Sequence, residues 1–307
     1  MSTLNLRIGT RASQLAQWQA NWVGDQLRRL GATVKLVEIT TCGDTEQSGP
    51  VAEIGVQGAF TKEIQTALLE SRVDVAVHSL KDLPTAPIEG LVLAAVPLRE
   101  NVADALVARG GSLFTSLPQA ARVGTGSLRR RSQLKHLRPD LQVVGIRGNV
   151  DTRLRKLDDG EYDAVILAAA GLSRLGLGSR ITELLQPPIM LPAPGQGALG
   201  IECREDATAA RELVSELNHS DSRYAVEAER SMLALLHGGC SAPIGAWGRM
   251  ENGRLALDGL VGDMNGTHIL RASASGSAEA AMDIGRNVAE QLLDLGAAGI
   301  IASARAG

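Results

Sequence analysis

The first two thirds of the chain alternate short apolar runs with helical patterns, and this alternation constrains the fold more than any other feature. Strands are predicted near 6–8, 34–39, 73–77, 122–124, 141–146 and 164–168, with helices over about 15–30 and 61–71 and from Ser127 and Asn149. Such alternation is typical of parallel sheets joined by crossover helices. We therefore expect αβ units that bind ligands at the carboxyl ends of their strands.

Polar motifs follow four of the predicted strands. They are Thr10-Arg11-Ala12-Ser13, Ser79-Leu80-Lys81-Asp82, Gly124-Thr125-Gly126-Ser127-Leu128-Arg129-Arg130 and Arg147-Gly148-Asn149. In three of the four, an arginine accompanies the start of a helix, where free N–H groups and the helix dipole favour an anion. The motifs therefore predict anion binding at the sheet edges.

The residue pattern changes after about Asp221. A helix that ends near Leu236 is followed by strand-like runs at 244–248, 254–261 and 268–274, and Asn-Gly pairs at 252–253 and 265–266 separate these runs. Because Asn-Gly between strands is a strong hairpin signal, we expect a small antiparallel sheet here. A helix over 278–295 closes it.

The net charge of −3 hides a strongly basic segment. Residues 122–156 hold ten Lys and Arg residues against two Asp residues, which indicates an anionic partner. Nucleic acid is not favoured, because aromatic residues are 2% of the chain and none lies in this segment to stack on a base. A small polycarboxylate or phosphate ligand fits better, with about half of the charges interpreted as solvated helix faces.

The three cysteines are far apart, which favours reduced thiols over a disulfide framework. The five histidines supply no second pair to complete a metal site, so no metal is expected. No apolar run is long enough to span a membrane, and the N-terminus lacks a targeting pattern. These features predict a cytoplasmic protein of two or three domains.

Cys240 lies in His237-Gly238-Gly239-Cys240-Ser241, just after a predicted helix. A thiol on a loop almost without side chains can be approached closely by a large group, such as a covalently held cofactor. A small buried cysteine after a helix cap is the alternative. A second glycine motif, Gly195-Gln196-Gly197-Ala198-Leu199-Gly200, follows prolines instead of a strand, so dinucleotide binding is not expected.

Six motifs occur in a defined order over nearly the whole chain. They are Arg7-Ile8-Gly9-Thr10-Arg11, Val77-His78-Ser79-Leu80-Lys81-Asp82-Leu83-Pro84, Gly126-Ser127-Leu128-Arg129-Arg130, Arg147-Gly148-Asn149-Val150, Leu191-Pro192-Ala193-Pro194-Gly195-Gln196-Gly197 and Gly238-Gly239-Cys240. Each is weak alone, but the set resembles the porphobilinogen deaminase, or hydroxymethylbilane synthase, family. That family joins four porphobilinogen molecules head to tail in tetrapyrrole synthesis.

The resemblance implies an α/β plus α+β fold. Two αβ domains similar to periplasmic binding proteins would span 1–98 with 198–216 and 103–191, and a small α+β domain with an antiparallel sheet would span 220–307. The discontinuity of the first domain comes from the resemblance alone. The family is also monomeric, which we carry over as an expectation.

The resemblance also implies the site. A dipyrromethane cofactor would be attached through a thioether to Cys240, and Asp82 would be the catalytic carboxylate. Cofactor-binding residues would be Lys81, Asp82, Ser13, Ser127, Arg129 and Arg130. Substrate-binding residues would be Arg11, Arg147, Arg153, Arg174 and Arg99. We place Arg138 on the surface, outside the site.

One residue and one four-residue segment depart from the family pattern. Alternative interpretations of Asp82 and of the function stay open. Gln57 stands where the family often has a lysine, and Asn101-Val102-Ala103-Asp104 stands where many members have Asp-Pro-Arg-Asp. Without the resemblance, the alternative reading of Asp82 is a helix N-cap or an ion-pair partner of Lys81. A non-catalytic carboxylate-binding protein with the same lobes, or an RNA-binding protein, remain the alternatives.

Overall fold

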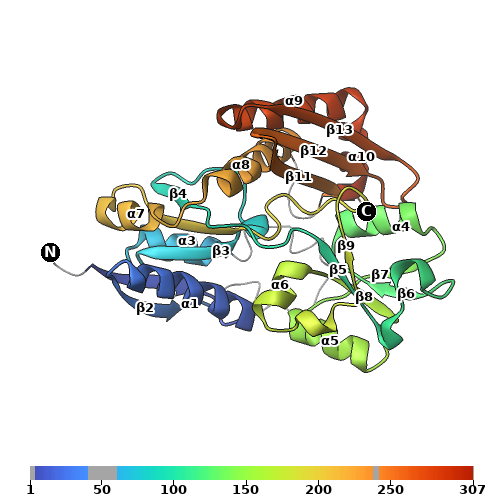
Figure 1. Cartoon of the computed structure of the whole chain (residues 1–307), viewed down its shortest axis with the longest axis horizontal. Coiled ribbons are helices and arrows are strands. Elements are labelled where there is room, and N and C mark those ends of the chain that lie inside the picture. Colours follow the sequence, from blue (N-terminus) through green and yellow to red (C-terminus); the bar gives the residue numbers. More distant parts are fainter. Residues whose placement is uncertain (1–3, 41–60, 238–241, 307) are drawn as a thin grey trace. The chain divides into compact units, whose positions relative to one another are not determined.

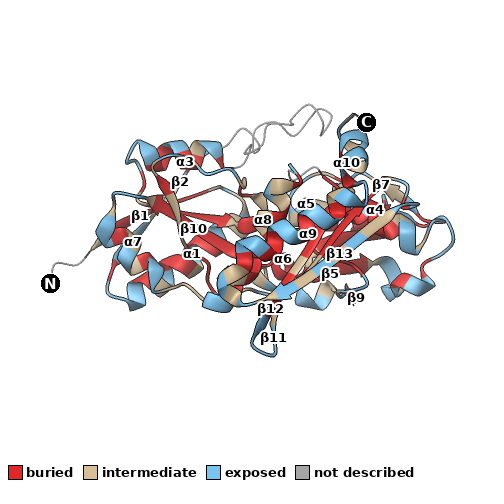
Figure 2. Cartoon of the chain, turned by 90° about the horizontal axis from the view of Figure 1, so that it is seen from above, coloured by how far each residue is buried: buried red, intermediate tan, exposed pale blue. Residues whose placement is uncertain are grey.

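The computed structural model of the chain describes residues 4–40, 61–237 and 242–306. The chain divides into two compact units, one formed by 1–100 with 198–223 and the other by 101–197 with 224–307. The three domain ranges expected from the sequence stay a prediction. Figure 1 labels the helices and strands, and Figure 2 shows that the central strands β3, β5, β8 and β10 are largely buried whereas β13 and most helices expose one side.

The first unit contains a five-stranded sheet in the order β2-β1-β3-β10-β4. Its strands are β1 (Asn5–Thr10), β2 (Thr33–Glu38), β3 (Val75–Ser79), β4 (Leu91–Ala95) and β10 (Leu199–Arg204). Its helices are α1 (Gln14–Arg29), α3 (Lys62–Leu69), α7 (Thr208–Ser215) and the 3-10 turn η1 (Leu80–Asp82). Apolar side chains of α1 and α7 fill one face of the sheet and those of α3 fill the other.

The second unit contains a five-stranded sheet in the order β7-β6-β8-β5-β9. Its strands are β5 (Asp104–Ala108), β6 (Arg122–Gly124), β7 (Gln142–Val144), β8 (Ala164–Ala168) and β9 (Glu183–Leu185). Its helices are α4 (Leu128–Leu137), α5 (Val150–Asp158) and α6 (Ala169–Arg174), with 3-10 turns η2 (Arg109–Gly111), η3 (Phe114–Ser116) and η4 (Gly178–Arg180). Separate hydrophobic clusters lie on its two faces.

The expectation of purely parallel sheets is wrong for one strand in each. β10 runs antiparallel between β3 and β4, and β5 runs antiparallel to β8. Both strands are almost wholly buried, so their backbone groups need partners on two sides. Those partners come from residues far away in the sequence, which local periodicity cannot detect.

A three-stranded antiparallel sheet completes the second unit. Its strands are β11 (Ile244–Glu251), β12 (Arg254–Gly262) and β13 (Ile269–Gly276). Helices α8 (Ser220–Leu235), α9 (Ala281–Asp294, after the 3-10 turn η5, Ala278–Ala280) and α10 (Ala297–Ala306) contribute to its core. Asn252 and Gly253 both have positive φ, so the first predicted hairpin turn is confirmed.

The predicted fold class, two αβ sheets with helices on both faces and a small α+β sheet, is therefore confirmed. The final helix α10 was not predicted, because its Ala- and Gly-rich sequence has little amphipathic period. In the part of the chain that the structure describes, no helix has the length and apolar character needed to cross a membrane.

Candidate active site

In the first unit, the predicted residues lie at one edge of the sheet. β1 and β3 are parallel, and β10 is antiparallel to both β3 and β4, so β1, β3 and β4 all end at the same edge. Arg11 follows β1, Lys81 and Asp82 follow β3, and Arg99 follows β4. All four residues are half-buried.

The backbone holds Asp82 firmly at this edge. The Leu80 N–H donates to the Ala198 carbonyl over 3.0 Å, and the Leu83 N–H donates to the Leu80 carbonyl over 3.1 Å. The buried Gln19 amide of α1 donates to the hydroxyl of Ser79 over 2.8 Å. These bonds tie η1 to both β10 and α1.

Asp82 itself has no hydrogen-bond or ion-pair partner among the residues that the structure describes. No helix follows it, and no ion pair joins it to Lys81, although Lys81 has a partner elsewhere. The two structural readings left open by the sequence are therefore not supported. The carboxylate is held at a sheet edge without a structural use of its own.

Ser13 and Ser127 cap helices. Ser13 accepts a hydrogen bond from the Ala16 N–H at the start of α1, and Ser127 accepts one from the Arg130 N–H at the start of α4, both over 3.4 Å. An N-cap of this kind fixes the first turn of a helix. Their hydroxyls thus have a structural role in addition to the binding role that the resemblance implies.

The arginines that the sequence predicts for the site in the second unit lie at one edge of its sheet. β6, β7 and β8 are parallel, and α4, Arg147 and α6 follow their respective carboxyl ends. The antiparallel β5 begins at the same edge with Asp104, which pairs with Ala168. Sequence reasoning thus located this edge correctly.

Arg129 and Arg130 form a buried cluster with Asp104. The exposed fractions of the three residues are 3%, 5% and 0%. Arg129 Nη1 lies 2.6 Å from Asp104 Oδ2, and Arg130 Nη2 lies 2.7 Å from Asp104 Oδ1. Burial opposes ionisation of Asp104, but the two guanidinium groups outweigh it and hold the pKa of this carboxyl well below its usual range.

Arg129 and Arg130 each carry a positive charge, and Asp104 neutralises one of them, so the cluster is net positive. Burial lowers the pKa of the Arg129 guanidinium, and Asp104 partly opposes that effect. Arg129 Nε is buried and has no hydrogen-bond partner in the described part of the chain. A buried, net-positive group with an unused donor suits a ligand that carries carboxylates.

The other predicted arginines of this unit differ in how they are held. Arg153 donates from Nε to the Gly148 carbonyl over 2.8 Å, and Arg174 donates from Nη2 to the Gly197 carbonyl over 2.7 Å. Arg147 is half-buried and makes no hydrogen bond or ion pair with any described residue. Of this set, Arg147 has a guanidinium whose donors have no partner among the residues that the structure describes.

Arg138, placed on the surface by the sequence, is half-buried and is held by the fold. Its guanidinium donates to Asp140 and to the carbonyls of Phe114, Thr115 and Leu117. The side chain therefore ties the end of α4 to the segment that carries η3. An ion-paired side chain with a fixed role in the fold cannot be distinguished by sequence from a solvated one.

Two polar residues were not identified as functional by sequence reasoning. Asp104 was noted only as part of a departure from the family pattern, and Gln196 only as part of a glycine motif. Gln196 is fully buried, and its amide donates to Asp104 Oδ1 over 2.9 Å. A buried acid beside an Arg-Arg pair is the signal that could have indicated this cluster.

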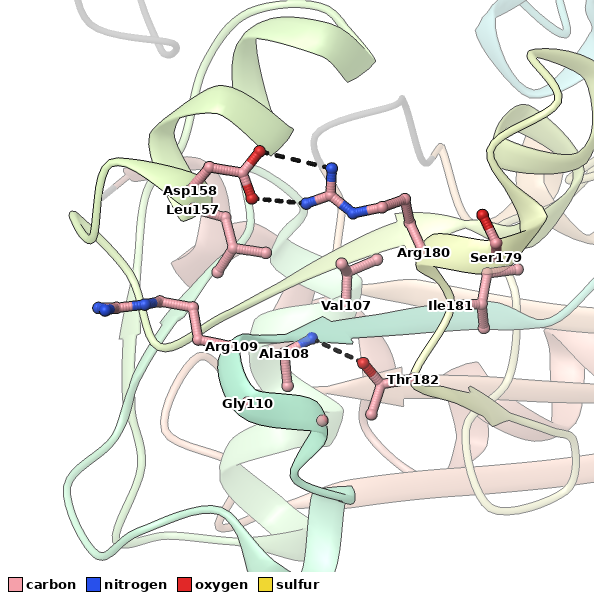
Figure 3. A pocket seen from close by; sticks show the side chains of 11 residues that line it. Val107, Ala108, Arg109, Gly110, Leu157, Asp158, Ser179, Arg180, Ile181 and Thr182 are labelled. Carbon is pink, nitrogen blue, oxygen red and sulfur yellow. Dashed lines mark hydrogen bonds and ion pairs between the residues drawn. The ribbon is translucent and has the colours of Figure 1, made fainter.

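A cavity of about 660 Å³ lies at the other end of β5, away from Asp104 (Figure 3). Arg180 pairs with Asp158 there, and the Thr182 hydroxyl accepts from the Ala108 N–H over 3.0 Å. None of the predicted site residues lines this cavity. The arginines predicted for the site in this unit lie at the Asp104 end of the sheet and not here.

Two predicted features lie outside the described residues, namely Cys240 with its glycines and Gln57. Cys203 is described: it is fully buried on β10, and burial raises the pKa of its thiol. A buried, protonated thiol is a poor nucleophile, so Cys203 is not a site for covalent attachment. No group of three or more His, Cys, Asp or Glu residues suited to a metal occurs among the described residues.

Comparisons with known proteins identify the family of the chain. The model of the porphobilinogen deaminase dipyrromethane cofactor binding domain matches residues 6–212, and that of the porphobilinogen deaminase C-terminal domain matches 223–294. The porphobilinogen deaminase of Desulforudis audaxviator is 49% identical over 302 residues, which cover 98% of each chain. That of Geobacter metallireducens is 48% identical over 304 residues, which cover 98% of this chain and 95% of its own.

Among solved structures, the methionine binding protein MetQ has a TM-score of 0.45 and 14% identity, and the match covers 74% of this chain and 94% of that one.

The matches to the two porphobilinogen deaminase domain models define a cofactor-dependent enzyme of two recognisable parts. More narrowly, the chain belongs to the porphobilinogen deaminase family, since both family models and nearly full-length relatives match it.

Proposed function

We propose that this chain is a transferase that joins four porphobilinogen molecules head to tail and yields hydroxymethylbilane, with one ammonia released at each condensation. The observation that carries the proposal is the net-positive edge of the second unit's sheet, where Arg129, Arg130 and Arg147 lie together. Each pyrrole of the growing chain carries an acetate and a propionate. Arginine binds such carboxylates through two parallel hydrogen bonds.

The residues divide by role. We assign Arg11, Arg99, Arg147, Arg153 and Arg174 to the carboxylates of the substrate. We assign Ser13, Lys81, Asp82, Ser127, Arg129 and Arg130 to the cofactor. A charge-assisted hydrogen bond contributes about 1.5–3 kcal/mol, so several are needed to retain a polyanionic intermediate between condensations.

The cofactor is dipyrromethane, and we place its thioether attachment at Cys240. When bound, it supplies the pyrrole carbon to which the first substrate unit is joined. The unused Arg129 Nε and the net charge of the Arg129, Arg130 and Asp104 cluster suit its carboxylates. The protein's part is to bind and orient these acids.

Asp82 acts on the substrate. Loss of ammonia from porphobilinogen leaves an electron-poor azafulvene whose positive charge is shared with the pyrrole nitrogen. A carboxylate fixed nearby stabilises that charge and accepts a hydrogen bond from the pyrrole N–H. Asp82 suits this role because its carboxylate has no partner within the described residues and its neighbours are held in place, Leu80 by the Ala198 carbonyl and Ser79 by Gln19 of α1.

We further propose that the protein is a cytoplasmic monomer that requires neither nucleic acid nor a membrane. Size-exclusion chromatography with light scattering tests the monomer. A non-catalytic carboxylate-binding protein would share the arginines but would not release ammonia from porphobilinogen.

One experiment tests the function and the attachment site together. The purified protein is treated with an acidic aldehyde reagent for pyrroles, and its intact mass is measured beside that of Cys240→Ala. We expect a pyrrole colour and the added mass of a dipyrromethane in the parent, both absent from Cys240→Ala, and hydroxymethylbilane formation by the parent alone. A pyrrole adduct on Cys240→Ala would refute this attachment site, and a parent without product would refute the function.

A further inference from the structure

Glu229 of α8 is a fully buried carboxylate with two defined partners. Its Oε2 accepts a hydrogen bond from the Gly195 N–H over 2.6 Å, and its Oε1 accepts one from the Gly248 N–H over 2.7 Å. Gly195 belongs to the turn before β10, and Gly248 belongs to β11. A single side chain thus joins three segments that are distant in sequence.

The Gly195–Gly197 turn contacts Arg174 and Asp104, the acid that pairs with Arg129 and Arg130. The Gln196 amide donates to Asp104 Oδ1 over 2.9 Å and to the Val102 carbonyl over 2.8 Å. The Gly197 carbonyl accepts from Arg174 Nη2 over 2.7 Å. The position of this turn therefore sets how Asp104 presents the Arg129 and Arg130 pair and where Arg174 lies.

The backbone leaves the turn few other restraints. Gly195 has a φ of +75° and Gly197 a φ of +85°, which are conformations that favour glycine. The Gln196 N–H donates to the Ala193 carbonyl over 2.9 Å, within the turn itself. Within the described residues, Glu229 is the side chain that binds the Gly195 N–H from outside the turn.

The other end of the link is rigid. A Cβ at Gly248 would lie 2.5 Å from the Ala225 carbonyl oxygen, so β11 and α8 are in direct backbone contact at this point. Glu229 lies one helical turn after Ala225, where its carboxylate meets the Gly248 N–H. The carboxylate is thus fixed by α8 and β11, and it fixes the turn.

We propose that Glu229 is a positioning residue for substrate binding, which acts through the Gly195–Gly197 turn to hold Arg174 in the orientation that binds substrate carboxylates and Arg129 in the orientation that binds the cofactor. This inference rests on the proposed function. It assigns to a residue of α8 a part in the specificity of arginines that lie on α4 and α6. Glu229 touches neither substrate nor cofactor in this scheme.

The test compares Glu229→Gln with Glu290→Gln. The first variant keeps side-chain size but replaces one acceptor oxygen with an amide group that cannot accept from an N–H. Glu290 is an exposed residue of α9, so the same chemical change there controls for the substitution itself. With cofactor-loaded protein, we expect KM for porphobilinogen to rise about tenfold in Glu229→Gln while kcat changes less than threefold. Glu290→Gln should match the parent.

A second variant, Gln196→Ala, removes the link between the turn and Asp104 but leaves the Glu229 contact with Gly195. We expect it to raise KM in the same way, and the double variant to raise KM by less than the product of the two single effects. A purely structural role would lower the thermal midpoint of Glu229→Gln and leave KM unchanged in both variants. That result would overturn the proposal.

The outcomes separate this inference from the proposed function. If Glu229→Gln does not fold, Gln196→Ala decides the matter alone, since unchanged KM there overturns the proposal and a raised KM supports it. If the parent forms no hydroxymethylbilane, the proposed function fails first. If the parent is active and the effects of Glu229→Gln and Gln196→Ala on KM multiply independently, only the positioning role fails.

Discussion

At the scale of single residues, the strongest contrast is between polar groups that the fold uses and those that it does not. Arg129, Arg130 and Arg138 are engaged with acids and carbonyls of the protein itself. Arg147 and Asp82 have no partner among the described residues. A half-buried charged group held without a structural use is a strong candidate for contact with a ligand.

Asp82→Asn tests the catalytic carboxylate. The substitution keeps size and most hydrogen bonding but removes the negative charge, so it separates electrostatics from packing. We expect turnover to fall by about 10²–10⁴-fold, the range for loss of one such contribution, and substrate binding to weaken far less. Steady-state formation of hydroxymethylbilane by folded, cofactor-loaded protein measures it. Asp206→Asn is the matched control, because the Asp206 side chain is 86% exposed. Turnover within a few-fold of the parent would remove Asp82 from the mechanism.

Arg147→Leu tests substrate binding. Because Arg147 makes no bond within the described protein, its loss should not destabilise the fold. We expect KM for porphobilinogen to rise by about tenfold or more, since one charge-assisted contact contributes about 1.5–3 kcal/mol. Arg131, an exposed residue of α4, provides the control Arg131→Leu. Arg138 would be a poor control, because its removal breaks a network in the fold. Equal KM values for the two variants would mean that Arg147 belongs to a solvated charge run.

At the scale of elements, β6 and β8 have the bounds that the sequence predicts, 122–124 and 164–168. β3 does not. Its apolar run predicts 73–77, but the strand spans Val75–Ser79 because Ser79 pairs with Leu199 of β10. Val73, the first residue of the predicted run, lies before the observed strand and packs against α3. Local pattern identifies such an element, and a distant partner sets where it ends.

The same reasoning explains which part of the site was found. Motifs next to strand ends located Asp82, Arg129 and Arg147, because each follows its strand directly. Gln196 and Glu229 were not recognised, since their roles arise only when segments near residues 104, 196, 229 and 248 meet in the folded chain. No residue spacing in the sequence indicates that these segments are in contact.

The second hairpin gives a prediction at the element scale. At the turn between β12 and β13, Asp263 accepts hydrogen bonds from the Thr267 N–H and hydroxyl and from His268. Burial opposes ionisation, but these bonds outweigh it and lower the pKa of Asp263 to about 2. Because the folded value is depressed, the turn gains stability from Asp263 above the ordinary Asp pKa and loses it as pH falls through about 2.

An NMR titration of the Asp263 carboxyl measures this value directly. Thr267→Val removes the hydroxyl donor, so the midpoint of the titration should move up toward that of an ordinary aspartate. A parent midpoint near 4 would show that the turn does not hold the carboxylate as the structure indicates.

At the scale of the whole molecule, Asp104 is the residue on which most of the site depends. It joins α4 through Arg129 and Arg130 to the Gly195–Gly197 turn through Gln196, and that turn is joined to α8 through Glu229. These contacts therefore connect the sheet edge that carries Arg129 and Arg130 to the core of the second unit. Loss of this one carboxylate should affect stability and binding together.

Asp104→Asn tests this dependence through pH. Removing one partner of a buried ion cluster costs about 3–5 kcal/mol, so the variant should be that much less stable than the parent at pH 7. The folded pKa of Asp104 lies well below its usual range, so its contribution is full above about pH 4 and declines below it, as the unfolded chain takes up a proton. Urea unfolding should therefore show the gap shrinking by about 1 kcal/mol between pH 7 and pH 3. The Asp206→Asn protein, changed at an 86% exposed side chain, should be close to the parent in stability at pH 7. A gap for Asp104→Asn that stays constant or widens on acidification would mean that this carboxyl is not ionised in the native cluster.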